Sequence, residues 1–300
     1  MAGSTAHIIQ SLVTNALIAA SKGVAAIITG SGALLAETIH SSADCGNQVL
    51  LLFGVKQARK PADAKHPLGY GRALYFWSFM VALLLFMGGG AFSIYEGIHK
   101  LQSPEPVTKV WLGFIILGFS LVIEGWATLS NVRELNKRRG KTPFFRFLRQ
   151  TKDSDLVVVF GENGAAVLGL ALAMASLAVA WQTKDPMWDA VGSLTIGVVL
   201  VFVAIFLAVE VQSLLVGERA DPRIEACVHE TIQEDARMIS ARTVVTVQQG
   251  PGEVMVAVKI RCRADVTAGE LSELINGFEA RLRGRCPEAK WCYVEPDLSA

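Results

Sequence analysis

The chain has little charge for its length. Asp, Glu, Lys and Arg make up 18% of its 300 residues, whereas about 25% is usual for a soluble protein. Part of the chain is therefore not expected to face water. The formal net charge is only +1, and this near balance gives no reason to expect nucleic acid as a partner.

The chain also lacks the motifs of several other classes. Its five cysteines include no CxxC pair and are odd in number, which indicates reduced thiols rather than a disulfide framework. No HExxH sequence is present, which argues against an intramembrane metalloprotease. We therefore expect a protein that is not an enzyme and that carries no prosthetic group. The first ten residues have no basic stretch before an apolar run, so a cleaved signal peptide is not expected.

Long apolar runs, in contrast, are abundant. Hydrophobic residues make up 52% of the chain, and six runs reach the roughly 20 residues that a helix needs to cross a bilayer. These runs lie at about 8–30, 33–56, 73–98, 109–130, 155–181 and 188–215. We predict an α-helical bundle of six transmembrane helices over residues 1–216.

Lysine and arginine are concentrated in two of the connecting segments. One lies between the second and third runs and the other between the fourth and fifth, while the remaining loops are short and poor in both residues. The positive-inside rule places both basic segments in the cytoplasm. Because the number of helices is even, both termini are predicted to be cytoplasmic, in the plasma or inner membrane if the protein is bacterial.

The composition changes after about Gly217, where apolar runs shorten and charges recur regularly. Amphipathic and alternating patterns predict a small α+β domain of order α-β-β-α-β over residues 217–300. The two predicted helices are Asp221–Met238 and Glu270–Arg283, and the three predicted strands are Thr243–Gln249, Glu253–Cys262 and Trp291–Glu295. The GPG between the first two strands indicates a hairpin.

Three carboxylates lie well inside the apolar runs: Asp44, Glu124 and Glu162. Each would cost about 2.5–3.5 kcal/mol at mid-membrane if it faced lipid. We therefore expect all three to face the interior of the bundle, and a functional role is the default hypothesis. Lys22 needs a partner in the same way, and Glu37 is a candidate.

His40 and Asp44 are four residues apart, so both side chains leave one face of the second helix. Imidazole together with carboxylate suits a borderline divalent ion such as zinc. Glu162 can join them if the fifth helix packs on the second. The alternative is a buried polar network whose members satisfy one another. Glu124 has either a proton-coupling role or a structural one.

Four motifs, in this order, resemble the cation diffusion facilitator family of divalent metal transporters: GSGALLAETIHSSADCGNQ, KHPLGYGRALYFWS, DPMWDAVGSLTIGVVL and QSLLVGERADP. The resemblance covers nearly the whole chain. The histidine-first variant HSSAD resembles the subgroup that includes zinc transporter nine. The resemblance implies six helices, a C-terminal dimerisation domain and a homodimer.

The family's transport site has two ligands on the second helix and two on the fifth, each pair four residues apart. The resemblance therefore assigns His40 and Asp44 to the first pair and Glu162 to the second. Val158 stands where the family has histidine, so one ligand is missing. Asn47 or Asn163 could supply an amide oxygen instead, and such an oxygen-rich site would also suit manganese, iron(II) or cobalt.

A second family site lies in the loop between the second and third helices. Asp63 and His66 match its first two ligands, but Tyr70 replaces the third, and a turn entering the third helix is the alternative interpretation. In the C-terminal domain, a zinc site could use His229, Cys292, Glu295 and Asp297, and Cys262 and Cys286 could join if the fold brings them close. A packed thiol is the more common role for a buried cysteine.

Together, the residues and the resemblance predict a secondary active transporter that exports a divalent cation, zinc first, from the cytoplasm in exchange for protons. With neutral His40, Asp44 and Glu162 carry a charge of −2, which a divalent ion cancels and which protons can cancel in its absence. The alternatives are transport of manganese, iron(II) or cobalt, and a membrane metal sensor or scaffold through which nothing passes.

Overall fold

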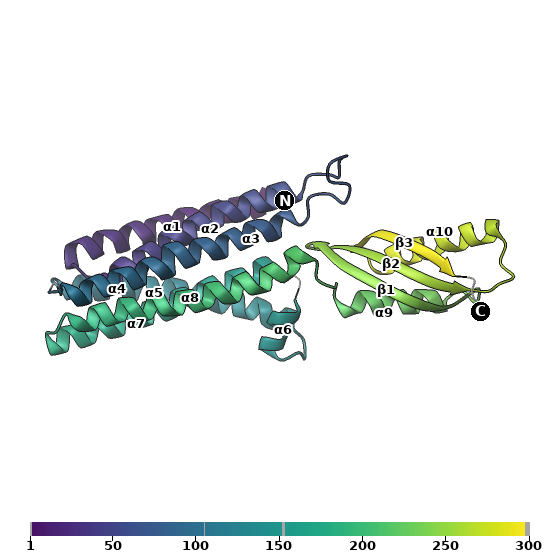
Figure 1. Ribbon diagram of the computed structural model, residues 1–300. Helices are drawn as coiled ribbons and strands as arrows, with labels where there is room; N and C mark the ends of the chain where they lie inside the picture. Colours follow the sequence, from purple (N-terminus) through teal and green to yellow (C-terminus); the bar gives the residue numbers. More distant parts are fainter. Residues whose placement is uncertain (1, 105, 152–153, 298–300) are drawn as a thin grey trace. The chain divides into compact units, whose positions relative to one another are not determined.

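The computed structural model describes residues 2–104, 106–151 and 154–297. They are mostly helical and divide into two compact units (Figure 1). The first unit is formed by the described residues of Met1–Gly54, Trp77–Leu148 and Ser154–Val211. The second is formed by those of Val55–Phe76, Arg149–Asp153 and Gln212–Ala300.

Each of the six predicted apolar runs is helical. Most helix ends lie within a few residues of those expected, but three of the helices extend further. The helices are α1 (Ala2–Thr29), α2 (Gly32–Ala58), α3 (Ala73–Leu84) continuing into α4 (Phe92–Gln102), α5 (Val110–Arg138), α7 (Ser154–Thr183) and α8 (Met187–Val216). In the first unit these helices form an elongated bundle (Figure 1).

Within the described residues, four helices are long and apolar enough to cross a membrane. They are Ala73–Gln102, Val110–Arg138, Val157–Thr183 and Met187–Val216, and a shorter apolar helix covers Asn15–Thr29. Helix α2 is 27 residues long, but the polar residues on one of its faces lower its average hydropathy. Length and composition alone therefore identify fewer spans than the six that the sequence predicted.

The third apolar run contains a feature that the sequence did not predict. Between α3 and α4, residues Leu85–Ala91 form a π-helical segment, η1, with the sequence LFMGGGA. Within it Gly90 is buried against α8, where a Cβ would lie 2.7 Å from Cγ2 and 3.2 Å from the backbone nitrogen of Val201. Glycine therefore permits the close approach of the two helices. A short helix, α6 (Phe144–Gln150), was likewise not predicted.

The C-terminal residues form a three-stranded sheet with two helices. Strand β1 (Met238–Gly250) pairs antiparallel with β2 (Glu253–Cys262), and β2 pairs parallel with β3 (Ala289–Asp297). Helices α9 (Pro222–Gln233) and α10 (Ala268–Arg285) share one hydrophobic core with alternate residues of β2. Helix α10 begins with a capping box between Thr267 and Glu270. The predicted order α-β-β-α-β is present.

One boundary in this domain was wrong. The sequence predicted a helix as far as Met238, but α9 ends at Gln233 and Met238 begins β1. The backbone N–H of Met238 donates to the carbonyl of Asp235, and the Asp235 carboxylate accepts hydrogen bonds from Arg237. The Arg237 side chain lowers the pKa of Asp235 to about 2. This local turn ends the helix, and β1 gains residues because Met238 pairs with Cys262.

Candidate metal centre

Helix α2 carries a polar stripe along one face: Glu37, His40, Ser41, Asp44 and Asn47. The spacings of three, four and seven residues place these side chains over successive turns of one helix face. Glu37, His40 and Asn47 are 0% exposed and Ser41 is 3% exposed. Although α2 is an apolar helix, this stripe faces the interior of the first unit and not its surface.

His40 and Asp44 lie together, as their spacing predicted. The distance from His40 Nε2 to Asp44 Oδ2 is 3.8 Å, which allows electrostatic attraction but is too long for a hydrogen bond. Within the described part of the chain, neither ring nitrogen of His40 has a hydrogen-bond partner, and neither has Asp44 Oδ1. Buried polar atoms are normally paired, so the unprotonated ring nitrogen of a neutral His40 and Asp44 Oδ1 are free to bind a cation.

Helix α7 brings Glu162 to the same stripe. The Asn47 side-chain amide donates a 2.6 Å hydrogen bond to Glu162 Oε1, and Asp44 is close enough to Glu162 for the two carboxyl groups to interact electrostatically. Val158, one turn before Glu162 on α7, is completely buried. The expected packing of the fifth apolar helix on the second is therefore present, with a direct contact between residues 115 positions apart.

The sequence also named two further polar residues, Asn163 and Glu124. Asn163 is partly exposed, and its backbone carbonyl accepts a hydrogen bond from Thr128 of α5. Of the two asparagines, Asn47 is the one in contact with Glu162. Glu124 of α5 is partly buried, and it is close enough to interact electrostatically with Lys22, His40 and Asp44.

Lys22 has the partner that the sequence suggested. Its ammonium group lies 3.2 Å from Glu37 Oε2 and donates a 2.7 Å hydrogen bond to Ser41 Oγ. Both charged side chains are 0% exposed. This ion pair joins α1 to the polar stripe of α2, because both partners of Lys22, Glu37 and Ser41, belong to that stripe.

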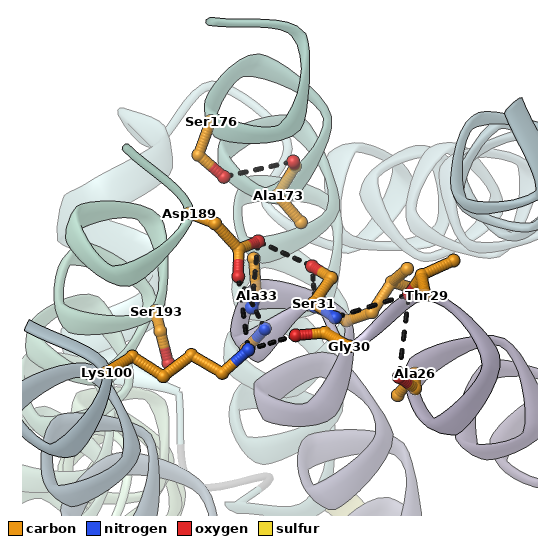
Figure 2. Close-up of polar contacts among 12 residues, drawn as sticks. Ala26, Thr29, Gly30, Ser31, Ala33, Lys100, Ala173, Ser176, Asp189 and Ser193 are labelled. Atoms are coloured by element: carbon orange, nitrogen blue, oxygen red, sulfur yellow. Dashed lines mark hydrogen bonds and ion pairs between the residues drawn. The ribbon is translucent and has the colours of Figure 1, made fainter. Parts of the chain in front are cut away.

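The beginning of α2 is held by residues from α4 and α8 (Figure 2). Asp189 of α8, 1% exposed, accepts hydrogen bonds from Ser31 Oγ at 2.5 Å and from the backbone N–H of Gly32 at 2.6 Å. Lys100 of α4 lies 3.6 Å from the same carboxylate and donates to the carbonyl of Gly30. A carboxylate at a helix N-terminus satisfies free N–H groups and complements the helix dipole. Asp189 thus fixes the start of the helix that carries the stripe.

In the loop before α3, the predicted auxiliary ligands Asp63 and His66 make local contacts. Asp63 Oδ1 accepts hydrogen bonds from the backbone N–H groups of Lys65 and His66, and Asp63 Oδ2 accepts one from the Tyr70 hydroxyl. The Tyr70 hydrogen bond, with the backbone bonds, lowers the pKa of Asp63. The rings of His66 and Tyr70 are in contact, with centroids 4.1 Å apart. These contacts are those of a turn, the alternative that the sequence left open.

The cysteines of the C-terminal domain are packed thiols. Cys227, Cys262 and Cys292 belong to its hydrophobic core. Burial raises the pKa of Cys292 to about 11, and burial together with Cys227 raises the pKa of Cys286 to about 12. Because the thiolate is the form that binds metals, these environments disfavour the zinc site considered for this domain.

No three His, Cys, Asp or Glu side chains lie close enough together to hold a metal ion in the part of the chain that the structure describes. His40 and Asp44 of α2 and Glu162 of α7 are therefore not gathered as a three-ligand set, and the contact between the two helices is made by the amide of Asn47. Sequence reasoning named Asn47 for this place, but it missed Ser41, Lys100 and Asp189. The only local signals were a serine one turn after Glu37 and an aspartate at the start of an apolar helix.

Comparison with known proteins identifies the family of this arrangement. The model of the cation efflux transmembrane domain matches residues 8–216, which include α2, α7 and the whole polar stripe. The chain belongs to the cation efflux family. This is a family of transporters and not of enzymes, and the apolar helices agree with an integral membrane protein.

Several relatives are similar over most of this chain. The mitochondrial proton-coupled zinc antiporter SLC30A9 of Xenopus laevis is 31% identical over 268 residues, which are 89% of this chain and 47% of the relative. The human SLC30A9 antiporter is 31% identical over 82% of this chain and 42% of its own length. Metal tolerance protein C4 of Arabidopsis thaliana is 33% identical over 75% of this chain and 50% of its own. The chain thus spans about half the length of these relatives, and within the cation efflux family it resembles zinc transporter nine.

Proposed function

We propose that this protein is a secondary active transporter that exports a divalent metal ion, zinc first, from the cytoplasm in exchange for protons. The observation that carries the proposal is the meeting of the buried polar stripe of α2 with Glu162 of α7, inside the matched cation efflux domain. The names of the SLC30A9 relatives support zinc and proton coupling.

In this proposal His40, Asp44 and Glu162 bind the metal, and Asn47 supplies an amide oxygen. The free ring nitrogens of His40 and the free Oδ1 atoms of Asp44 and Asn47 support this assignment. Asn163 is a weaker candidate because it lies beside the contact and not in it. Asp63 and His66 are not proposed as ligands, because a turn already uses the Asp63 carboxylate.

The charges of this centre suggest the exchange. Neutral His40 with ionised Asp44 and Glu162 gives a charge of −2, which one divalent ion cancels. When the ion leaves, the two carboxylates remain in a medium of low dielectric, and protons restore neutrality. Glu124, whose charge interacts with Asp44, is the proposed proton-coupling residue outside the ligand set.

The proposal includes six spans, with α1 and α2 added to the four identified by composition. These two helices have 28 and 27 residues, more than the roughly 20 required. Their polar groups face inward, where they do not contact lipid. Residues 1–216 form the transport domain and residues 217–300 a cytosolic domain, with both termini in the cytoplasm.

We also propose a homodimer held largely by the C-terminal domain. The face of the sheet away from α9 and α10 carries one row in register, Val245, Ala257 and Tyr293. Val245 is 47% exposed and Tyr293 is 55% exposed. A second copy of the chain would cover this row, since contiguous apolar patches on a surface mark sites that bind another protein.

Transport is tested with purified protein in sealed vesicles. Zinc should enter when a proton gradient is imposed, and protons should move in the opposite direction. Binding of zinc without flux would favour a metal sensor or scaffold. A faster flux of manganese, iron(II) or cobalt would identify a different cargo, which the oxygen-rich ligand set makes the second candidate.

A further inference from the structure

One buried cation lies beside the proposed metal centre and has no part in the exchange described above. The Lys22 ammonium is 2.7 Å from Ser41 Oγ and 3.2 Å from Glu37 Oε2, and its side chain is 0% exposed. A buried ammonium without a carboxylate partner would be costly. Glu37 is the partner that makes its burial possible.

The surroundings of Glu37 hold its carboxylate in place. A Cβ at Gly169 of α7 would collide with Glu37 Oε1, so the absence of a side chain there creates the space for the carboxylate. Close by, α1 and α2 approach each other tightly, because a Cβ at Gly23 would lie 3.1 Å from Cγ2 of Thr38. Lys22 and Glu37 are therefore confined between three helices.

Lys22 is also within reach of the metal ligands. Ser41, which accepts its hydrogen bond, lies three residues before Asp44, and residues at this spacing are neighbours on a helix surface. The charge of Lys22 acts on Asp44 as well as on Glu37. An ammonium released by Glu37 would find Asp44 as the next carboxylate along the stripe.

We propose that Glu37 is a charge anchor, which keeps the Lys22 ammonium off Asp44 and so leaves Asp44 free to bind the divalent ion. This inference rests on the proposed function, because it gives Asp44 the role of a metal ligand. Glu37 is a positioning residue here: it does not touch the metal, and it acts through Lys22. An ammonium on Asp44 would cancel one of the two carboxylate charges and would repel the incoming ion.

The experiment is a titration of purified full-length protein with zinc, and separately with manganese, at one pH. The variants are Glu37→Gln, Lys22→Met and the double variant with both changes. Glu37→Gln releases the ammonium and should weaken binding of both metals about tenfold or more. Lys22→Met removes the competing cation and should not weaken binding. The double variant should bind within about threefold of the wild type.

An ion pair with only a structural role gives a different pattern. In that case Lys22→Met and Glu37→Gln lower the thermal stability alike, and the dissociation constant of the folded fraction stays the same for both. Equal weakening by the two single changes, or a double variant as weak as Glu37→Gln, would overturn the charge anchor. Glu134→Gln is the matched control, because it removes a half-buried carboxylate near the end of α5 that pairs with Lys137 and Arg138 and not with Lys22.

A second route to the same displacement avoids changing either charge. Gly169→Ala places a methyl group against Glu37 Oε1 and should weaken metal binding, and Lys22→Met in the same chain should restore it. Failure of the restoration argues against the anchor. A wild type that binds neither zinc nor manganese overturns the proposed function and this inference together, whereas a binding wild type with unaffected variants overturns the inference alone.

Discussion

Replacing Asp189 by asparagine tests how the start of α2 is held. The side chain keeps its shape, but one carboxylate oxygen becomes an NH₂ group. That group would face donors, because Ser31 Oγ and the N–H of Gly32 both donate to Asp189 and Lys100 lies 3.6 Å away. The amide can therefore satisfy fewer of the groups that surround Asp189 (Figure 2), and the remaining ones stay buried without a partner.

The expected loss of unfolding free energy follows from the hydrogen bonds and the ion pair that Asp189→Asn weakens or removes. A hydrogen bond to a charged group contributes about 1.5–3 kcal/mol, and breaking a buried ion pair by removing one partner costs about 3–5 kcal/mol. Asp189 and Lys100 are 1% and 11% exposed, so solvent screens them little. The contributions are not additive, and we expect a total loss of about 3 kcal/mol, or a fall in melting temperature of about 6–12 °C.

The assay is thermal unfolding of the purified protein in detergent, followed by circular dichroism. Asp185→Asn is the matched control: it makes the same change four residues earlier, where the carboxylate accepts a hydrogen bond from the exposed N–H of Met187, and it should cost about 1 kcal/mol or less. If Asp189→Asn melts within about 2 °C of this control, the contacts at the start of α2 do not stabilise the bundle as argued.

Three further predictions concern the proposed function. Asp44→Ala should abolish zinc flux in vesicles while the protein stays folded in the membrane, whereas Ser42→Ala, on the exposed side of α2, should keep it; normal flux in Asp44→Ala would contradict the site. Val158→His should add an imidazole one turn from Glu162 and tighten zinc about tenfold, roughly 1.4 kcal/mol. An unchanged preference for zinc over manganese would mean that residue 158 does not face the metal. Tyr293→Glu should shift the mass in detergent from dimer to monomer by placing a charge on the open face of the sheet, and a mass that stays dimeric would place the interface elsewhere.

Several features followed from short-range patterns and needed no tertiary structure. The length of the apolar runs predicted the helices because a bilayer span has a fixed length. The four-residue spacing of His40 and Asp44 predicted their contact because the geometry of a helix turn is constant. In the C-terminal domain, alternation in Glu253–Cys262 predicted β2 with both ends correct, since one face of that strand is buried throughout.

Other features depended on residues far apart in the chain, and no local pattern could reveal them. Asn47 meets Glu162 across 115 positions, and Asp189 reaches Ser31 across 158. The π-helical segment Leu85–Ala91 was not predicted either. Its three successive glycines allow many backbone conformations, and in the π-helical one Gly90 lies in close contact with α8. Local sequence was enough to specify the long apolar helices and which face of α2 carries charge. The partners of Asp189 were decided by the packing of the helices, because a buried charge must be paired but its sequence position does not say with what.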